Sequence, residues 1–389
     1  MTLPRLVLHI GQHKTGSKAV QSFLAHNAGR YQEQGILYPV EETDPHGISA
    51  YANSHFRLYV LLKRECLNAA GNTKTAAEFW AKHKIYCNSI GSTDEFFKSL
   101  ASERARAAAS QVVISAEDLF DMQSAHGTGF SLELVALAAR RLYQLITEYQ
   151  FEPRVIVYLR RQDHLLCAHY AQYIKGSLVH TETFDEFRQA FAPRLESFPI
   201  LHCWSEAFGT QNIQVRPYEQ ATIPAGTVTD FNRQILQCVR ASQWPTPPVD
   251  PESTNPTPGR DFIEYFRLLN AHHAGDEHLL LRKAVLETAL ESSIKSQTRQ
   301  WLSPTDQLAL LSSHANGNTR IAREFLHVED GTLFSELPPD PRENWTPYPG
   351  LSAETTLAIS VAAYQKTLGL QPRRQGRFQN MIGRLLGRS

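Results

Sequence analysis

The sequence has little cysteine, and its cysteines are not arranged for a structural role. Five of its 389 residues are cysteine, an odd number, and no two of them form a C-x-x-C pair. The chain therefore offers neither a disulfide framework nor a zinc ligand set, and we expect it in a reducing compartment. The cysteines are Cys66, Cys87, Cys167, Cys203 and Cys238.

Two further features are missing, namely an excess of charge of one sign and a long hydrophobic run. The 39 Lys and Arg residues balance 39 Asp and Glu residues, whereas proteins that coat nucleic acid carry a basic excess. No run reaches the ~18 apolar residues that a membrane-spanning helix needs, and the first residues lack a signal-peptide pattern. We expect no nucleic-acid partner, and a location in the cytoplasm or on the inner face of the membrane.

Apolar runs typical of buried strands alternate with segments of helical period. Strands separated by helices indicate βαβ units, so the sequence predicts an α/β fold with a doubly wound, mainly parallel sheet. The expected strands are 5–10, 35–39, 111–115, 154–159 and 212–216. The clearest expected helices are 17–29, 132–149 and 162–174.

Shifts in composition divide the chain into four parts. Residues 1–243 form the expected α/β core, with a helical insert at about 47–110. Six prolines mark 244–258 as an extended linker. A helical region at 259–335 is expected to pack on the core, and 336–389 combines a second proline cluster with a basic tail.

The segment between the first strand and the first helix holds the most informative residues. Gly11 and Gly16 permit a sharp turn, and Lys14, Ser17 and Lys18 add positive charge and a hydroxyl group. In a strand–loop–helix context, backbone N–H groups and the helix dipole converge on an anion. The sequence therefore predicts a phosphate-type binding loop.

The loop departs from the nucleotide-binding pattern G-x-x-x-x-G-K-[ST]. Gly11 and Gly16 have the required spacing, but Ser17 stands where the lysine belongs. Lys18 is followed by Ala19, so the hydroxyl that binds Mg²⁺ is out of register. A kinase or NTPase that uses ATP and Mg²⁺ is the alternative interpretation of this loop.

The loop resembles the K-T-G-T-T segment of sulfotransferases that use 3′-phosphoadenosine 5′-phosphosulfate (PAPS). Lys14, Thr15, Gly16 and Ser17 match that segment, and Lys18 replaces its last threonine. The resemblance implies that these five residues bind the 5′-phosphosulfate and that Lys14 also assists catalysis. It further implies a P-loop-like three-layer sandwich, with PAPS as co-substrate and no metal.

A second segment, 158–170, resembles the 3′-phosphate motif of the same family. Arg160 follows the expected strand 154–159 and matches the phosphate-binding arginine of that motif. Ala168 stands at the position of the family's serine, and Arg161 and His169 are candidates to take its place. Segments 115–118, 215–219 and 318–326 also resemble the family, and the likeness covers roughly 5–335.

Sulfuryl transfer to a hydroxyl requires a general base, for which Glu117 is the first candidate. It follows the strand 111–115, at the edge where open α/β sheets bind ligands. The other interpretation of Glu117 is a carboxylate at a helix N-terminus with Ser115 as the cap. His46 and His55 are rival bases, and no H-E-x-x-H pattern indicates a metal.

The family resemblance implies transfer to a carbohydrate or other cell-envelope acceptor, such as a glycolipid. A third interpretation is a scaffold that binds the donor without turning it over. It is suggested by two departures from the family pattern, Ala168 in place of the serine and Lys18 in place of the last threonine. Residues 373–389 contain five arginines and no acid, with apolar residues at helical spacing. This pattern predicts contact with an anionic membrane surface, and it also fits a tail that docks on its own domain or has no regular structure.

Overall fold

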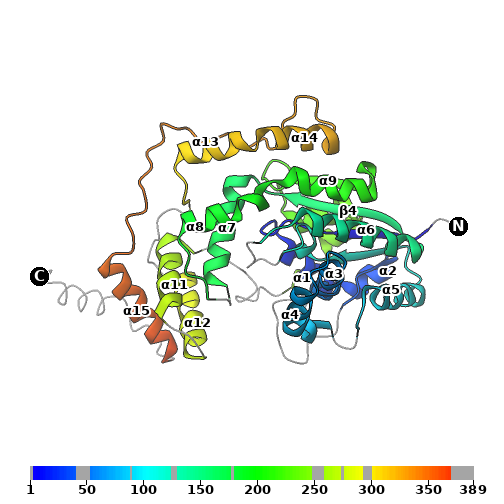
Figure 1. The fold of residues 1–389 in the computed structure, drawn as a ribbon, viewed down its shortest axis with the longest axis horizontal. Helices are drawn as coiled ribbons and strands as arrows, with labels where there is room; N and C mark the ends of the chain where they lie inside the picture. Colours follow the sequence, from blue (N-terminus) through cyan, green and yellow to red (C-terminus); the bar gives the residue numbers. More distant parts are fainter. Residues whose placement is uncertain are drawn as a thin grey trace, which may run out of the picture. The chain divides into compact units, whose positions relative to one another are not determined.

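The computed structural model describes residues 3–40, 53–87, 90–123, 129–176, 179–247, 258–272, 276–291 and 300–368. The chain divides into two compact units, whose helices and strands are labelled in Figure 1. The first, here the sheet unit, comprises Met1–His169, Arg188–Asn255 and Pro304–Pro341. The second, here the helical unit, comprises Tyr170–Phe187, Pro256–Ser303 and Arg342–Ser389.

In the part of the sheet unit that the structure describes, five strands lie in the order β2-β3-β1-β4-β5, and every pairing between neighbours is parallel. The expected α/β class and parallel sheet are therefore confirmed, and β1 lies at the centre. The strands are β1 (Arg5–His9), β2 (Ile36–Leu37), β3 (Gln111–Ser115), β4 (Glu152–Leu159) and β5 (Ile213–Pro217).

Helices cover both faces of this sheet. Leu6 and Leu8 of β1 belong to one hydrophobic core, while Val7 between them belongs to another, and all three are fully buried. Because successive side chains of a strand point to opposite faces, the two cores lie on the two sides of the sheet. The continuous apolar character of β1 follows from this double burial.

Helices of the sheet unit contribute buried residues to one or the other of these two cores. One core includes α1 (Ser17–His26) and α2 (Ala28–Glu33). The other includes α3 (Phe56–Ala69), α6 (Leu132–Glu148) and α9 (Ser197–Phe208). The remaining helices are α4 (Thr73–His83), α5 (Thr93–Ala107), α10 (Thr227–Asp230), α13 (Pro304–Ser313) and α14 (Ala315–Leu326).

Two expectations about the helices are refined by the structure. The expected helix 17–29 is interrupted at Asn27, whose side chain donates to the Phe23 carbonyl and so ends α1. Over its described residues, the insert at 47–110 contributes the helices α3 to α5 between β2 and β3. Helix α7 (Gln162–Lys175) begins in the sheet unit and ends in the helical unit.

The helical unit contains α11 (Arg260–His272), α12 (Asp276–Glu291) and α15 (Ala353–Thr367). Helix α8 (Phe184–Phe191) begins in this unit. Helix α15 is not among the helices expected from the sequence; at its start the Ser352 hydroxyl accepts the Thr355 N–H. The expected helical region 259–335 is divided between the units, because residues from 304 onward belong with the sheet.

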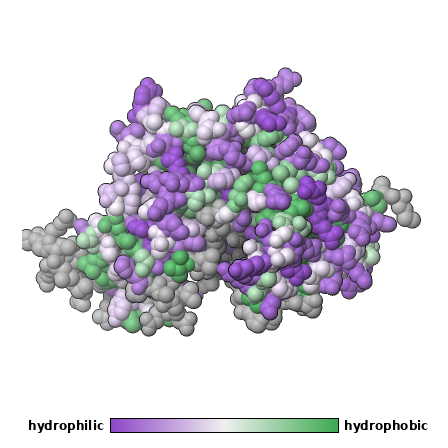
Figure 2. Space-filling model, in the orientation of Figure 1, coloured by the Kyte–Doolittle hydropathy of each residue, from purple (hydrophilic) through white to green (hydrophobic). Residues whose placement is uncertain are grey.

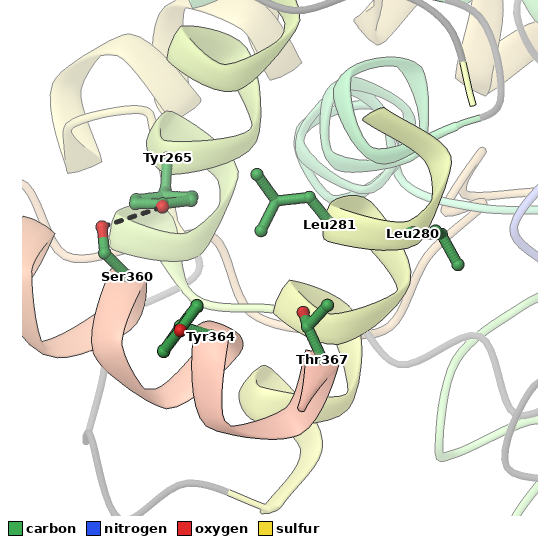
Figure 3. A pocket seen from close by; sticks show the side chains of 6 residues that line it. All are labelled: Tyr265, Leu280, Leu281, Ser360, Tyr364 and Thr367. Carbon is green, nitrogen blue, oxygen red and sulfur yellow. Dashed lines mark hydrogen bonds between the residues drawn. The ribbon is translucent and has the colours of Figure 1, made fainter. Parts of the chain in front are cut away.

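A cavity of about 470 Å³ opens among α11, α12 and α15 of the helical unit (Figure 3). Tyr265 and Ser360 face each other there, with their hydroxyl oxygens 2.9 Å apart. Leu280 and Tyr364 line the cavity and are also exposed to solvent. On the face drawn in Figure 2, hydrophobic surface is visible over these helices.

Over the described ranges, no helix combines the length and the apolar character needed to cross a membrane. Most of the proline-rich linker 244–258 and the basic tail 373–389 lie outside the described residues. The predicted membrane contact of the tail therefore stays a prediction.

Candidate functional site

The loop that joins β1 to α1 is built on three residues in the left-handed conformation. Gly11, Lys14 and Gly16 have φ values of 43°, 69° and 84°. Gly16 is the N-cap of α1, and its carbonyl accepts the N–H groups of residues 19 and 20. The amides of Ser17 and Lys18 therefore lie in the first turn of α1, where helices attract anions.

The order of the strands places this loop at a topological switch point, where the connections that follow neighbouring strands run to opposite faces of the sheet. Helix α1 follows β1 and packs on one face of the sheet. Helix α6 follows β3 and packs on the opposite face, as does α9 before β5. In open α/β sheets, ligands bind outside the carboxyl ends of strands at such a point.

Lys14 and Arg160, which the sequence separates widely, are in direct contact. The Nη1 atom of Arg160 donates to the Lys14 carbonyl oxygen at 3.0 Å. The Arg160 guanidinium also lies 5.6 Å from the centre of the Tyr218 ring. Burial lowers the pKa of Arg160 below its ordinary value, but an arginine keeps its charge in proteins. The two expected anion-binding side chains therefore belong to one region.

Ser17 is a buried hydroxyl without a hydrogen-bond partner. Its side chain is 5% exposed, and its Oγ is among the buried polar atoms that no described group satisfies. A Cβ atom at Gly11 would lie 2.9 Å from this Oγ and 3.3 Å from the Cβ of Glu117. Glycine at position 11 thus lets Ser17 and Glu117 approach the loop. Lys18 is exposed on α1.

Glu117 follows β3 and is held beside the loop by a glutamine of α1. Its Oε2 accepts a hydrogen bond of 2.5 Å from Nε2 of Gln21. The same amide lies 3.2 Å from the Ser115 Oγ, which is 2.8 Å from Nδ1 of His9. Ser115 is therefore a partner of Gln21 and His9, and the expected capping role is not what the structure shows; the N-cap of this turn is Ala116.

The two rival bases have different outcomes. His46 lies outside the described residues. His55 is 1% exposed, and its Nδ1 accepts the Ser115 N–H at 3.0 Å. Burial lowers the pKa of His55 to about 4, so its ring is neutral at pH 7 and serves to hold the end of β3.

Of the two residues considered as substitutes for the serine at position 168, Arg161 is held by other groups, whereas the Nδ1 atom of His169 is buried without a hydrogen-bond partner among the described residues. The Nε and Nη2 atoms of Arg161 each lie 2.9 Å from an oxygen of Asp163, and Nη1 donates to the carbonyls of residues 336 and 337. Ala168 is buried. The ring of His169 lies edge-on to the ring of His13, with 5.5 Å between the centroids.

A buried polar cluster beside the loop is not among the expected site residues. The Nε2 atom of His13 is 3.1 Å from the Gln123 carbonyl oxygen and 3.8 Å from Oδ1 of Asp118. Arg194 forms an ion pair of 2.5 Å with Asp121. Burial lowers the pKa of His13 and raises that of Asp118. The available signal was His13 itself, a polar residue inside the loop between β1 and α1.

The downstream segment 215–219 also reaches this region. The Tyr218 N–H donates to the Leu159 carbonyl at 2.6 Å, next to Arg160. Glu219 accepts hydrogen bonds from the backbone N–H groups of Ser335 and residue 336. Through these hydrogen bonds, Glu219 connects the loop after β5 to the backbone at residues 335 and 336.

The loop conformation at Gly16 supplies a stability test. A Cβ atom there would lie 2.7 Å from the Thr227 Oγ1, and φ is in the left-handed region. Gly16→Ala is expected to lower the free energy of unfolding by about 2 kcal/mol in urea denaturation. Gly29→Ala is the matched control, because a Cβ at Gly29 meets no atom within 4 Å. An equal effect of both substitutions would contradict the close approach of Thr227.

No family model, curated protein or solved structure matches the chain. Among the residues that the structure describes, no group of three or more His, Cys, Asp or Glu side chains is placed to hold a metal ion. None of the predicted site residues lines the cavity of the helical unit.

Proposed function

We propose that the protein is a sulfotransferase with a P-loop-like sheet unit. It moves the sulfuryl group of PAPS to a hydroxyl of a carbohydrate or other cell-envelope acceptor, such as a glycolipid. The observation that carries the proposal is the contact between the Lys14 loop and Arg160 at the carboxyl ends of β1 and β4.

The residues present fit a donor that is anionic at two places. The first turn of α1 offers amide N–H groups, the buried hydroxyl of Ser17 lacks a partner, and Lys14 adds a positive charge. These groups, with Thr15, Gly16 and Lys18, would bind the 5′-phosphosulfate. Arg160 would bind the 3′-phosphate through charge-assisted hydrogen bonds. PAPS supplies the activated sulfuryl group.

The chemistry of the chain's own residues follows from their charge. Lys14 would stabilise the negative charge that develops on the leaving phosphate oxygen. In-line transfer depends mainly on positioning, and backbone amides from the first turn of α1 provide it without a metal. Glu117, held by Gln21, would accept the proton of the attacking hydroxyl.

Glu117→Gln is expected to lower turnover about a hundredfold, because the amide cannot accept the hydroxyl proton. Affinity for adenosine 3′,5′-bisphosphate should change less than about twofold, since Glu117 is not among the proposed donor ligands. Transfer of labelled sulfate and calorimetry measure the two quantities. Equal losses of turnover and binding would contradict a role as the base.

Calorimetry tests the donor class. Adenosine 3′,5′-bisphosphate is expected to bind, and Arg160→Ala is expected to weaken that binding about thirtyfold. ATP with Mg²⁺ is expected to bind far more weakly. Tight binding of ATP–Mg²⁺ alone would support the kinase or NTPase alternative. Bisphosphate binding without sulfate transfer to any member of a broad acceptor screen would support the inactive scaffold.

A further inference from the structure

Gln12 lies between the two proposed donor-binding segments and contacts both. Its side chain is 3% exposed. Its Oε1 accepts the backbone N–H of Arg160 at 2.9 Å, and its Nε2 lies 3.4 Å from the Ser197 Oγ at the start of α9. Its backbone carbonyl accepts the Thr15 hydroxyl at 2.6 Å.

The contact with Arg160 occurs on the side of β4 that faces β1, beyond the last residue that β1 pairs with. The pairing of β1 with β4 ends at His9 and Ile156, three residues before the end of β4. Beyond that register the backbone of β4 has no β1 partner, and the Gln12 side chain replaces it at Arg160. An N–H group that loses its acceptor is destabilised. Gln12 therefore holds the backbone of residue 160 on the side facing β1, while β5 and Tyr218 hold the other side of β4 up to Leu159.

The side chain of Arg160 is held by the same loop that holds its backbone. Gln12 and Lys14 are separated by one residue, and the Lys14 carbonyl accepts the Arg160 guanidinium. One short segment of the loop therefore holds both the backbone and the side chain of Arg160. Displacing residue 12 would change the distance between Lys14 and Arg160, and with it the fit to a ligand that needs both.

We propose that Gln12 is a positioning residue that couples the Lys14 loop to Arg160, so that the two bind opposite ends of one bisphosphorylated nucleotide. The inference rests on the proposed function for the identity of the nucleotide. Gln12 acts through Arg160 and contacts no ligand itself.

A double-mutant cycle on adenosine 3′,5′-bisphosphate binding tests this coupling. Gln12→Leu, of similar size, is expected to raise the dissociation constant about tenfold in the otherwise unchanged protein. In an Arg160→Ala background the same substitution is expected to raise it less than about twofold, because the group it positions is gone. Ser197→Ala is the matched control; it removes only the longer contact of Gln12, and a change below about twofold is expected.

The possible outcomes distinguish a coupling of the Lys14 loop to Arg160 from a general structural role of Gln12. Equal losses of affinity in both backgrounds would overturn the proposal, as would an unchanged dissociation constant for Gln12→Leu. Urea denaturation identifies variants that do not fold, and Gln12→Met repeats the cycle if Gln12→Leu is one of them. If the unsubstituted protein fails to bind the bisphosphate, the proposed function is overturned, and the coupling with it.

Discussion

Lys14→Ala is expected to lower sulfuryl transfer about a thousandfold. Lys14 lies in the loop after β1, and its carbonyl contacts Arg160. The substitution removes the charge proposed to stabilise the leaving phosphate oxygen and keeps the Cβ atom, so the backbone strain at φ 69° is unchanged. Transfer of labelled sulfate to an acceptor from the screen measures the effect.

Lys14→Gly separates the side chain from the backbone at this position. Glycine adopts the left-handed conformation readily, so this variant should be more stable to urea than Lys14→Ala by about 1 kcal/mol. Its transfer rate should nevertheless be equally low. Lys98→Ala, at an exposed lysine of α5, should leave transfer unchanged. Recovery of transfer in Lys14→Gly would mean that the conformation of the loop, and not the ammonium group, supports the reaction.

Acidification from pH 7 to pH 5 is expected to lower the free energy of unfolding by about 4 kcal/mol through two buried histidines. Burial lowers the pKa of His9 and of His55 from 6.5 to about 4. Between these values the unfolded chain binds protons that the folded protein does not. The stability is therefore complete above about pH 6.5 and is lost as the pH falls towards 4.

His55→Gln assigns this effect to a particular residue. The variant should lose less stability than the unsubstituted protein between pH 7 and pH 5, by about half of the expected difference, since one of the two groups no longer titrates. Urea denaturation at both pH values measures it. Burial raises the pKa of Asp118, and this carboxyl therefore makes the folded protein relatively more stable as the pH falls. The test is for this reason the difference between the variant and the unsubstituted protein. An undiminished pH effect in His55→Gln would contradict the assignment.

Local sequence patterns predict the strands and the glycine-bearing loop between β1 and α1 well. The run Gln111–Ser115 is the strand β3 as expected, and the apolar runs around it are strands of one parallel sheet. The central strands β1 and β3, and β4 from Val155 onward, are buried on both faces, so the requirement for continuous apolar residues is visible in the sequence itself. The loop is equally visible, because its glycines occupy left-handed positions that other residues adopt at a cost.

Patterns of this kind predict less about helices whose apolar face is weak. Helix α15 has only two buried residues, Ile359 and Ala363, and follows a segment rich in proline. Its apolar period is therefore indistinct, and packing within the helical unit stabilises it instead. The division of 259–335 between two units likewise depends on contacts between distant segments, which no local period encodes.

The sequence by itself determined the α/β class, the parallel sheet and the loop between β1 and α1, since each depends on neighbouring residues. Only the tertiary structure decided that Arg160 contacts Lys14, that Arg161 pairs with Asp163 and that Gln12 joins the two segments. The physical reason is that these contacts depend on strand order and register, which bring the ends of β1 and β4 together across more than a hundred residues of intervening chain.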